Sequence, residues 1–212
     1  MTPIKKPVEE VAAAAATDCD QYITPDCVKA LYQIPPGNLS TPGNELGIFE
    51  TGDTYDQTDL DLFFLLMYNE IPIGTHPTPN LVDGAQAPTE LLLGGEESAL
   101  DFQISYPVIW PQGSVLFQTD DINYSEGSEY TGFLNNFLDA IDGSYCSVTE
   151  PEDPPYPDPS PGGYNQPKQC GVYKATNVVS VSYGESESDL PVSYQKRQCN
   201  EYLKLSLSVC FP

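Results

Sequence analysis

Short apolar runs alternate along this chain with segments of helical periodicity, and this alternation is the feature that most restricts its fold. Strands are predicted at residues 46–50, 114–119 and 177–183, because these runs are short and apolar or β-branched. The intervening loops are long enough for crossover connections between parallel strands. The sequence therefore predicts an α/β fold in which helices flank a parallel sheet.

Helical periodicity and helix-start signals mark five further segments. Helices are predicted at residues 27–32, 57–66, 94–104, 132–141 and 193–207. Two segments are too rich in proline, glycine and asparagine for regular structure and are predicted to be loops. They are residues 71–88 and residues 146–170.

The charge balance restricts the partners that this chain can have. The 31 Asp and Glu residues outnumber the 8 Lys and Arg residues, which gives a formal net charge of -23. Binding to nucleic acid or to an anionic membrane through a basic surface is therefore excluded. Such a chain is suited to acidic surroundings, where its carboxylates lose their charge. The alternative, an acidic surface that only maintains solubility, stays open.

The six cysteines indicate disulfides more than a metal site. None of them has CxxC spacing, and His76 is the only histidine, so a zinc pattern is absent. Disulfides form in oxidising compartments. Residues 1–16 contain no apolar core of signal-peptide length, and no stretch is long enough to span a membrane. Either the protein is cytosolic, or its true N-terminus is missing.

One pair of acids has a spacing that suits proton transfer. Glu97 and Asp101 are four residues apart on a predicted helix, which places both on one face with Cβ atoms about 6 Å apart. Two such carboxyls can share a proton and accept another from a hydroxyl nucleophile at acidic pH, where a histidine base would be charged. The alternative is a pair of solvated acids near a helix start, and spacing alone favours this plainer interpretation.

Five separated blocks, in this order, resemble the sedolisin family of serine-carboxyl peptidases, and especially its fungal secreted tripeptidyl-peptidases. The blocks are CDQYITPDC (19–27), LGIFE (46–50), GGEESALDFQ (94–103), FLDAIDGSYC (137–146) and VSVSYG (179–184). The resemblance covers residues 18–205. It implies a subtilisin-like α/β fold with a serine nucleophile, a glutamate base and a supporting aspartate.

The family motif assigns roles to particular residues of this sequence. Its E-x-x-x-D pair falls on Glu97 and Asp101, and its auxiliary acid at the end of the first strand falls on Glu50. The resemblance also places Ser182, Tyr183 and Gly184 on the strand that binds the substrate backbone; Tyr183 replaces the tryptophan of many relatives. The three carboxyls are expected to converge on a cleft. The catalytic residues are thus predicted to be Glu97, Asp101 and Glu50. The substrate-binding residues are predicted to be Ser182, Tyr183 and Gly184.

The resemblance stops before two family motifs. The ASGDSG segment, whose Asp helps to form the oxyanion hole, and the GTSxS segment, which carries the serine, do not occur in the 212 residues. We therefore expect residues 18–212 to be a partial, truncated peptidase domain, the N-terminal half, and to be inactive alone. Residues 1–17 are expected to be a linker or a remnant of the prosegment junction. Two alternatives are a non-catalytic peptide-binding remnant and a fragment of a gene prediction that does not fold alone.

Further expectations follow from the family. The substrate is a peptide or protein, the location is extracellular although this chain shows no signal peptide, and no nucleic acid or membrane partner is expected. No cofactor or metal is expected in this chain, because the intact family domain binds its calcium near a C-terminus that has no counterpart here. Disulfides are predicted between Cys19 and Cys27 and between Cys146 and Cys170, since each pair brackets a short loop and the family context is oxidising.

Overall fold

A parallel four-stranded sheet forms the centre of the computed structural model, which describes residues 19–125 and 132–208. Its strands are β1 (Leu46–Thr51), β2 (Thr78–Val82), β3 (Ser114–Thr119) and β4 (Val178–Val181), in the spatial order β2-β3-β1-β4. All three strand pairs are parallel, so the predicted α/β class is confirmed. The expected segment 1–17 lies outside the described residues.

Each predicted helix is present, although the one predicted at residues 94–104 spans Glu96–Ile109 and continues through Pro107. The helices are α2 (Pro25–Leu31), α3 (Gln57–Met67), α4 (Glu96–Ile109), α5 (Ile122–Ser125), α6 (Asn135–Ile141) and α7 (Val192–Ser208), with a short 3-10 helix at Tyr145–Ser147. The start of α2 illustrates the local causes: the Thr24 hydroxyl accepts a hydrogen bond from the Cys27 backbone N–H, and Pro25 occupies the first turn, where no N–H is needed. None of the described helices is long and apolar enough to cross a membrane.

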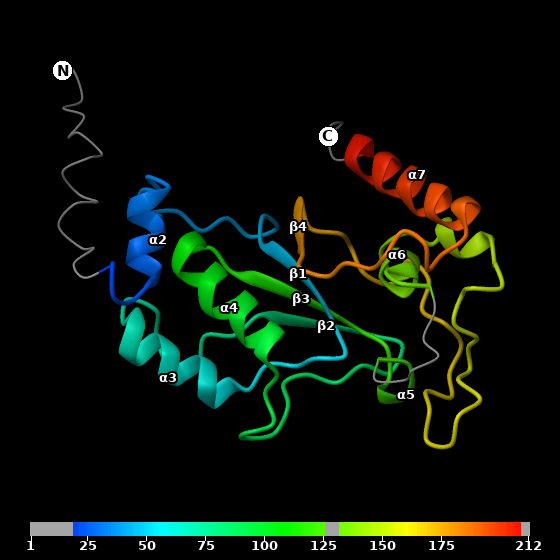
Figure 1. The fold of residues 1–212 in the computed structure, drawn as a ribbon, viewed down its shortest axis with the longest axis horizontal. Helices are drawn as coiled ribbons and strands as arrows, with labels where there is room; N and C mark the ends of the chain where they lie inside the picture. Colours follow the sequence, from blue (N-terminus) through cyan, green and yellow to red (C-terminus); the bar gives the residue numbers. More distant parts are fainter. Residues whose placement is uncertain (1–18, 126–131, 209–212) are drawn as a thin grey trace.

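Helices cover both faces of the sheet, with α3 and α4 on one side and α6 and α7 on the other (Figure 1). Neighbouring residues of a strand point to opposite faces, and β1 shows this directly. Ile48 packs with Phe64 and Phe102 in the first core, whereas Phe49 packs with Phe137 in the second. Both cores consist of fully or nearly fully buried aromatic and aliphatic side chains, which fixes the register of the sheet.

The structure corrects three predicted boundaries. Residues 71–88 are not only a loop, because they contain strand β2. This strand includes Pro79 and Asn80, two residue types that are rare in strands. The proline is tolerated because β2 is an edge strand that pairs only with β3. The predicted strand 177–183 is shorter and ends at Val181. Helix α6 begins at Asn135 and not at 132, after Leu134 with a left-handed φ of 62°.

Both predicted disulfides are present. Cys19 is bonded to Cys27, and Cys146 is bonded to Cys170 with a sequence separation of 24. The second bond closes the proline-rich loop as predicted. Among the described residues, Cys199 is an exposed free thiol.

Candidate active site

Glu50 lies near the carboxyl end of β1, where its side chain is fully buried. Its Oε2 accepts a 2.8 Å hydrogen bond from the Tyr183 hydroxyl, and its Oε1 has no hydrogen-bond partner among the described residues. Burial raises the pKa of Glu50 to about 8; the hydrogen bond from Tyr183 opposes this, and the charges of neighbouring acids add to it. Those neighbours are Asp101, Asp53 and Glu97. The Glu50 carboxyl is therefore neutral at acidic pH.

Helix α4 presents the predicted acid pair beside Glu50. The pKa of Glu97 is raised by burial and then by the charges of Asp101 and Asp53. The pKa of Asp101 is raised by burial and lowered by a hydrogen bond from Ser182. The Ser182 hydroxyl lies 2.9 Å from both carboxylate oxygens of Asp101. The three acids predicted from the sequence are thus electrostatically coupled in the folded chain.

A fourth acid, Asp53, fixes the start of α4. Its Oδ2 accepts hydrogen bonds from the backbone N–H groups of Glu97 (2.8 Å) and Ser98 (3.4 Å), which are free donors in the first turn of the helix. Gly95 is required here, because a Cβ at this position would lie 1.3 Å from the Asp53 carboxylate. Asp53 therefore holds the acid-bearing helix against the loop that follows β1.

The predicted substrate-binding residues divide into two kinds. The side chains of Ser182 and Tyr183 bind the acids Asp101 and Glu50, and the Tyr183 ring packs edge-on against Phe49 at 5.4 Å between centroids. Gly184 is exposed, and a Cβ there would meet no atom within 4 Å. The segment after β4 thus has a role that its sequence did not indicate: its hydroxyls hold the carboxyls in place.

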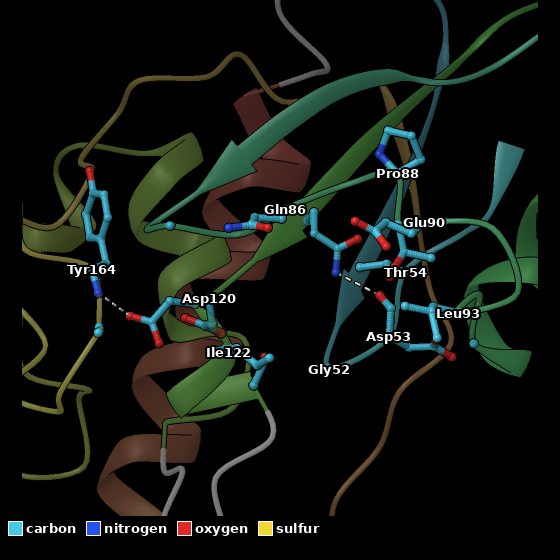
Figure 2. A pocket seen from close by; sticks show the side chains of 18 residues that line it. Gly52, Asp53, Thr54, Gln86, Pro88, Glu90, Leu93, Asp120, Ile122 and Tyr164 are labelled. Atoms are coloured by element: carbon cyan, nitrogen blue, oxygen red, sulfur yellow. Dashed lines mark hydrogen bonds between the residues drawn. The ribbon is translucent and has the colours of Figure 1, made fainter.

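The cavity nearest the three acids is not lined by them. A cavity of about 850 Å³ lies beside them and is lined by Asp53 and Gly95, but Glu50, Glu97 and Asp101 are not among its lining residues. Figure 2 shows Asp53, Thr54 and Glu90 on one side of this cavity and Asp120 on the other. The burial of Glu50 under Tyr183 is the physical reason that its carboxyl does not reach the cavity.

A second group of buried acids anchors the proline-rich loop. The Asp83 carboxylate accepts from the Gln169 backbone N–H (2.8 Å), while the Gln169 side chain accepts from the Asp83 N–H (3.0 Å). Lys168 forms a 2.6 Å ion pair with Asp139. Burial raises the pKa of Asp83 to about 7. These contacts, with the disulfide, hold the loop against the carboxyl end of β2 and against helix α6.

The described residues contain no group of three or more His, Cys, Asp or Glu side chains that could hold a metal ion. His76, the single histidine, lies in a loop with its Nδ1 2.9 Å from the Pro77 carbonyl oxygen.

Asp53 is the site residue that sequence reasoning missed, and the bonds from the Ser182 and Tyr183 hydroxyls to Asp101 and Glu50 were not predicted either. No local pattern connects Asp53 to a helix that begins more than 40 residues later. The sequence feature that could have indicated a close contact at this helix start is Gly95, a glycine just before a helix whose first turn carries two acids.

The site therefore consists of a buried glutamate near the end of the first strand of a parallel sheet and an E-x-x-x-D pair on a helix beside it. Comparison with known proteins agrees. The chain is 60% identical to tripeptidyl-peptidase sed1 of Aspergillus fumigatus over 190 residues. This aligned region covers 89% of the chain and 30% of the relative. The chain is 52% identical over 213 residues to aorsin of Aspergillus oryzae (95% and 32%). It is 39% identical over 201 residues to tripeptidyl-peptidase SED1 of Arthroderma otae (90% and 29%).

The chain is thus homologous to part of two tripeptidyl-peptidases and of aorsin, in agreement with the resemblance of its sequence to the sedolisin family. It spans about 30% of the length of these curated relatives. No protein-family model matches the chain, and no solved structure matches it.

Proposed function

We propose that this chain supplies the acid half of a peptidase active site, in which Glu97 is the general base, Asp101 supports it and Glu50 extends the proton network. The observation that carries the proposal is the electrostatic coupling of the three carboxyls, of which Glu50 is fully buried and two, Glu50 and Asp101, are held by hydroxyls of the segment after β4. Two of the relatives are named tripeptidyl-peptidases, and this supports a peptide or protein as the substrate.

The geometry suits proton transfer at acidic pH. A carboxylate can still act as a base at a pH where a histidine is already protonated. A raised pKa makes that carboxylate a stronger base toward the attacking hydroxyl. In this proposal Glu97 takes the proton of an attacking hydroxyl. Asp101, oriented by Ser182, accepts the hydrogen bond that protonated Glu97 then donates, and neutral Glu50 can donate a hydrogen bond into the same network.

The serine and the oxyanion aspartate are not assigned to this chain. The two sequence motifs with which the family supplies them do not occur in the 212 residues. We therefore expect no peptide hydrolysis by the chain alone, since loss of the nucleophile leaves only residual rate enhancement. An extracellular location is part of the proposal and is supported by the two disulfides.

The proposed proton network can be tested by ¹³C NMR titration of the side-chain carboxyls. Asp101→Asn is expected to lower the pKa of Glu97, because the Asp101 charge is one of the causes that raise it. Ser182→Ala is expected to raise the pKa of Asp101, since it removes a hydrogen bond to the charged form. Glu70→Gln, an exposed acid outside the site, is the control. A Glu97 pKa that is the same in the wild type and in Asp101→Asn would contradict the coupling.

A second candidate is peptide binding without catalysis. Among the described strands β4 is an edge strand that pairs only with β1, so one side of its backbone can accept an extended peptide as an added strand. Amide chemical shifts of residues 178–184 on addition of an extended peptide would detect this binding. Unchanged shifts at millimolar peptide would exclude it.

A further inference from the structure

Glu50 and Gln118 lie side by side on the two central strands of the sheet. They are Cα partners in the parallel pairing of β1 with β3, and paired strands lie about 4.8 Å apart. Both side chains point to the face that α3 and α4 cover, because Ile48 and Leu116, two positions earlier on the two strands, pack in the first core. The two side chains are therefore neighbours under the helix that carries the acid pair.

The side-chain amide of Gln118 has only one favourable orientation. Its Nε2 donates a 2.8 Å hydrogen bond to the backbone carbonyl oxygen of Asp53, which follows β1. A carbonyl oxygen accepts hydrogen bonds and donates none, so a turned-over amide would place two acceptors against each other. The Gln118 side chain thus extends over the carboxyl end of β1, and its Oε1 is the atom left to bind another group.

Each of the two side chains has one buried oxygen without a hydrogen bond. Glu50 is 0% exposed and Gln118 is 2% exposed. Neither Glu50 Oε1 nor Gln118 Oε1 has a hydrogen-bond partner among the described residues. A buried acceptor without a donor is costly. One proton on Glu50 Oε1 would satisfy both atoms, since a protonated carboxyl donates one hydrogen bond and an amide oxygen accepts it.

Most of the groups that face Glu50 favour its protonated form. The acids around it are Asp101 and Glu97 on α4 and Asp53 on the loop after β1. Burial and the charges of these acids raise the pKa of Glu50 to about 8. Tyr183, on the segment after β4, donates to Oε2 and favours the charged form instead. A neutral carboxyl can keep this bond at Oε2 while it donates from Oε1.

We propose that Gln118 is a positioning residue for Glu50: its Oε1 accepts the hydrogen bond that the protonated Glu50 carboxyl donates, and this contact keeps the carboxyl neutral and oriented. The inference rests on the proposed function, in which neutral Glu50 belongs to the proton network of the acid pair. It gives the hydrogen bond from Glu50 a defined acceptor. Through Asp53, the same contact connects Glu50 to the first turn of α4.

A ¹³C NMR titration of the Glu50 carboxyl in the 212-residue chain tests this inference. Gln118→Met keeps the length of the side chain and removes the acceptor. Because a hydrogen bond to the neutral form favours that form, its loss is expected to lower the pKa of Glu50 by about 0.5 to 1. A role of Gln118 in packing alone predicts no change or a higher pKa, since a less polar neighbour disfavours the charged carboxyl.

Two further variants establish that the sign of the change is informative. Tyr183→Phe removes a hydrogen bond to the charged form and is expected to raise the pKa of Glu50. Gln166→Met, the same change at an exposed glutamine of the proline-rich loop, is expected to leave it unchanged. A Glu50 pKa that stays the same or rises in Gln118→Met would overturn the inference.

The wild type decides the question if Gln118→Met does not fold. The ¹³C signal of Gln118 Cδ is expected to titrate with the same midpoint as the Glu50 carboxyl, and to lose this transition in Glu50→Gln. A Gln118 signal without the transition would overturn the inference. The proposed function is tested separately by the response of Glu97 to Asp101→Asn. If that response is present while Glu50 is unchanged in Gln118→Met, only the role of Gln118 is removed.

Discussion

Replacing Glu50 by glutamine is expected to stabilise the chain at neutral pH and to change its stability little at pH 4. Glutamine has the shape of the protonated carboxyl and can still accept the hydrogen bond from Tyr183. The wild-type carboxyl has an ordinary pKa of 4.5, which burial raises to about 8 in the folded chain. The variant has no proton to retain, so it lacks this source of pH dependence.

The sign and size of the effect follow from proton linkage. A raised pKa means that the contribution of neutral Glu50 is complete below pH 4.5 and is lost as the pH rises toward 8. In the wild type, the unfolded chain releases this proton between pH 4 and pH 7 while the folded chain keeps it. The free energy of unfolding therefore falls by about 3 kcal/mol over that interval, at about 1.4 kcal/mol per pH unit, because of this group.

Urea unfolding at pH 4, 5, 6 and 7 and constant ionic strength, followed by circular dichroism, measures this difference. Glu70→Gln is the matched control, since it removes one exposed carboxylate from a chain of formal net charge -23 and is expected to change stability by less than about 0.5 kcal/mol. Curves of stability against pH that run parallel for the wild type and Glu50→Gln would refute the assignment of a raised pKa to Glu50.

Two further predictions concern the supports of the site. Gly95→Ala is expected to displace the Asp53 carboxylate from the start of α4 and to lower the free energy of unfolding by about 1 to 2 kcal/mol, measured by urea unfolding; an unchanged midpoint would show that Asp53 does not hold this helix. The double substitution Cys146→Ser and Cys170→Ser is expected to cost about 3 kcal/mol by opening the loop of 24 residues, with Cys199→Ser, a change at a free thiol, as the control; equal melting temperatures for the two variants would contradict this.

The sequence was sufficient for the parts of the fold that depend on local pattern. Strands β1 and β3 are apolar runs buried on both faces, and the predicted boundaries agree with the structure to within one residue. Strand β2 was missed because Pro79 and Asn80 are read locally as loop residues. Its place is determined by pairing with β3, a contact between segments that local propensity does not describe.

The candidate site divides in the same way. The spacing of Glu97 and Asp101 on one helix and the position of Glu50 at the end of a strand are visible in the sequence and in its resemblance to the family. The hydrogen bond from Tyr183 to Glu50 joins residues 133 positions apart, and it exists because β4 pairs with β1. Tertiary contacts of this kind determine which carboxyls are buried, and therefore which pKa values are raised.

The central claim is that this chain supplies the acids of a peptidase site and not its nucleophile, and a hydrolysis assay tests it most directly. The purified chain is incubated from pH 3 to pH 7 with a denatured protein and with a tripeptidyl fluorogenic substrate, alongside Glu97→Ala. No turnover is expected from either protein, because neither family motif that carries the serine or the oxyanion aspartate occurs in the 212 residues. Turnover by the wild type that disappears in Glu97→Ala would contradict the claim, because a hydroxyl of this chain would then be acting as the nucleophile.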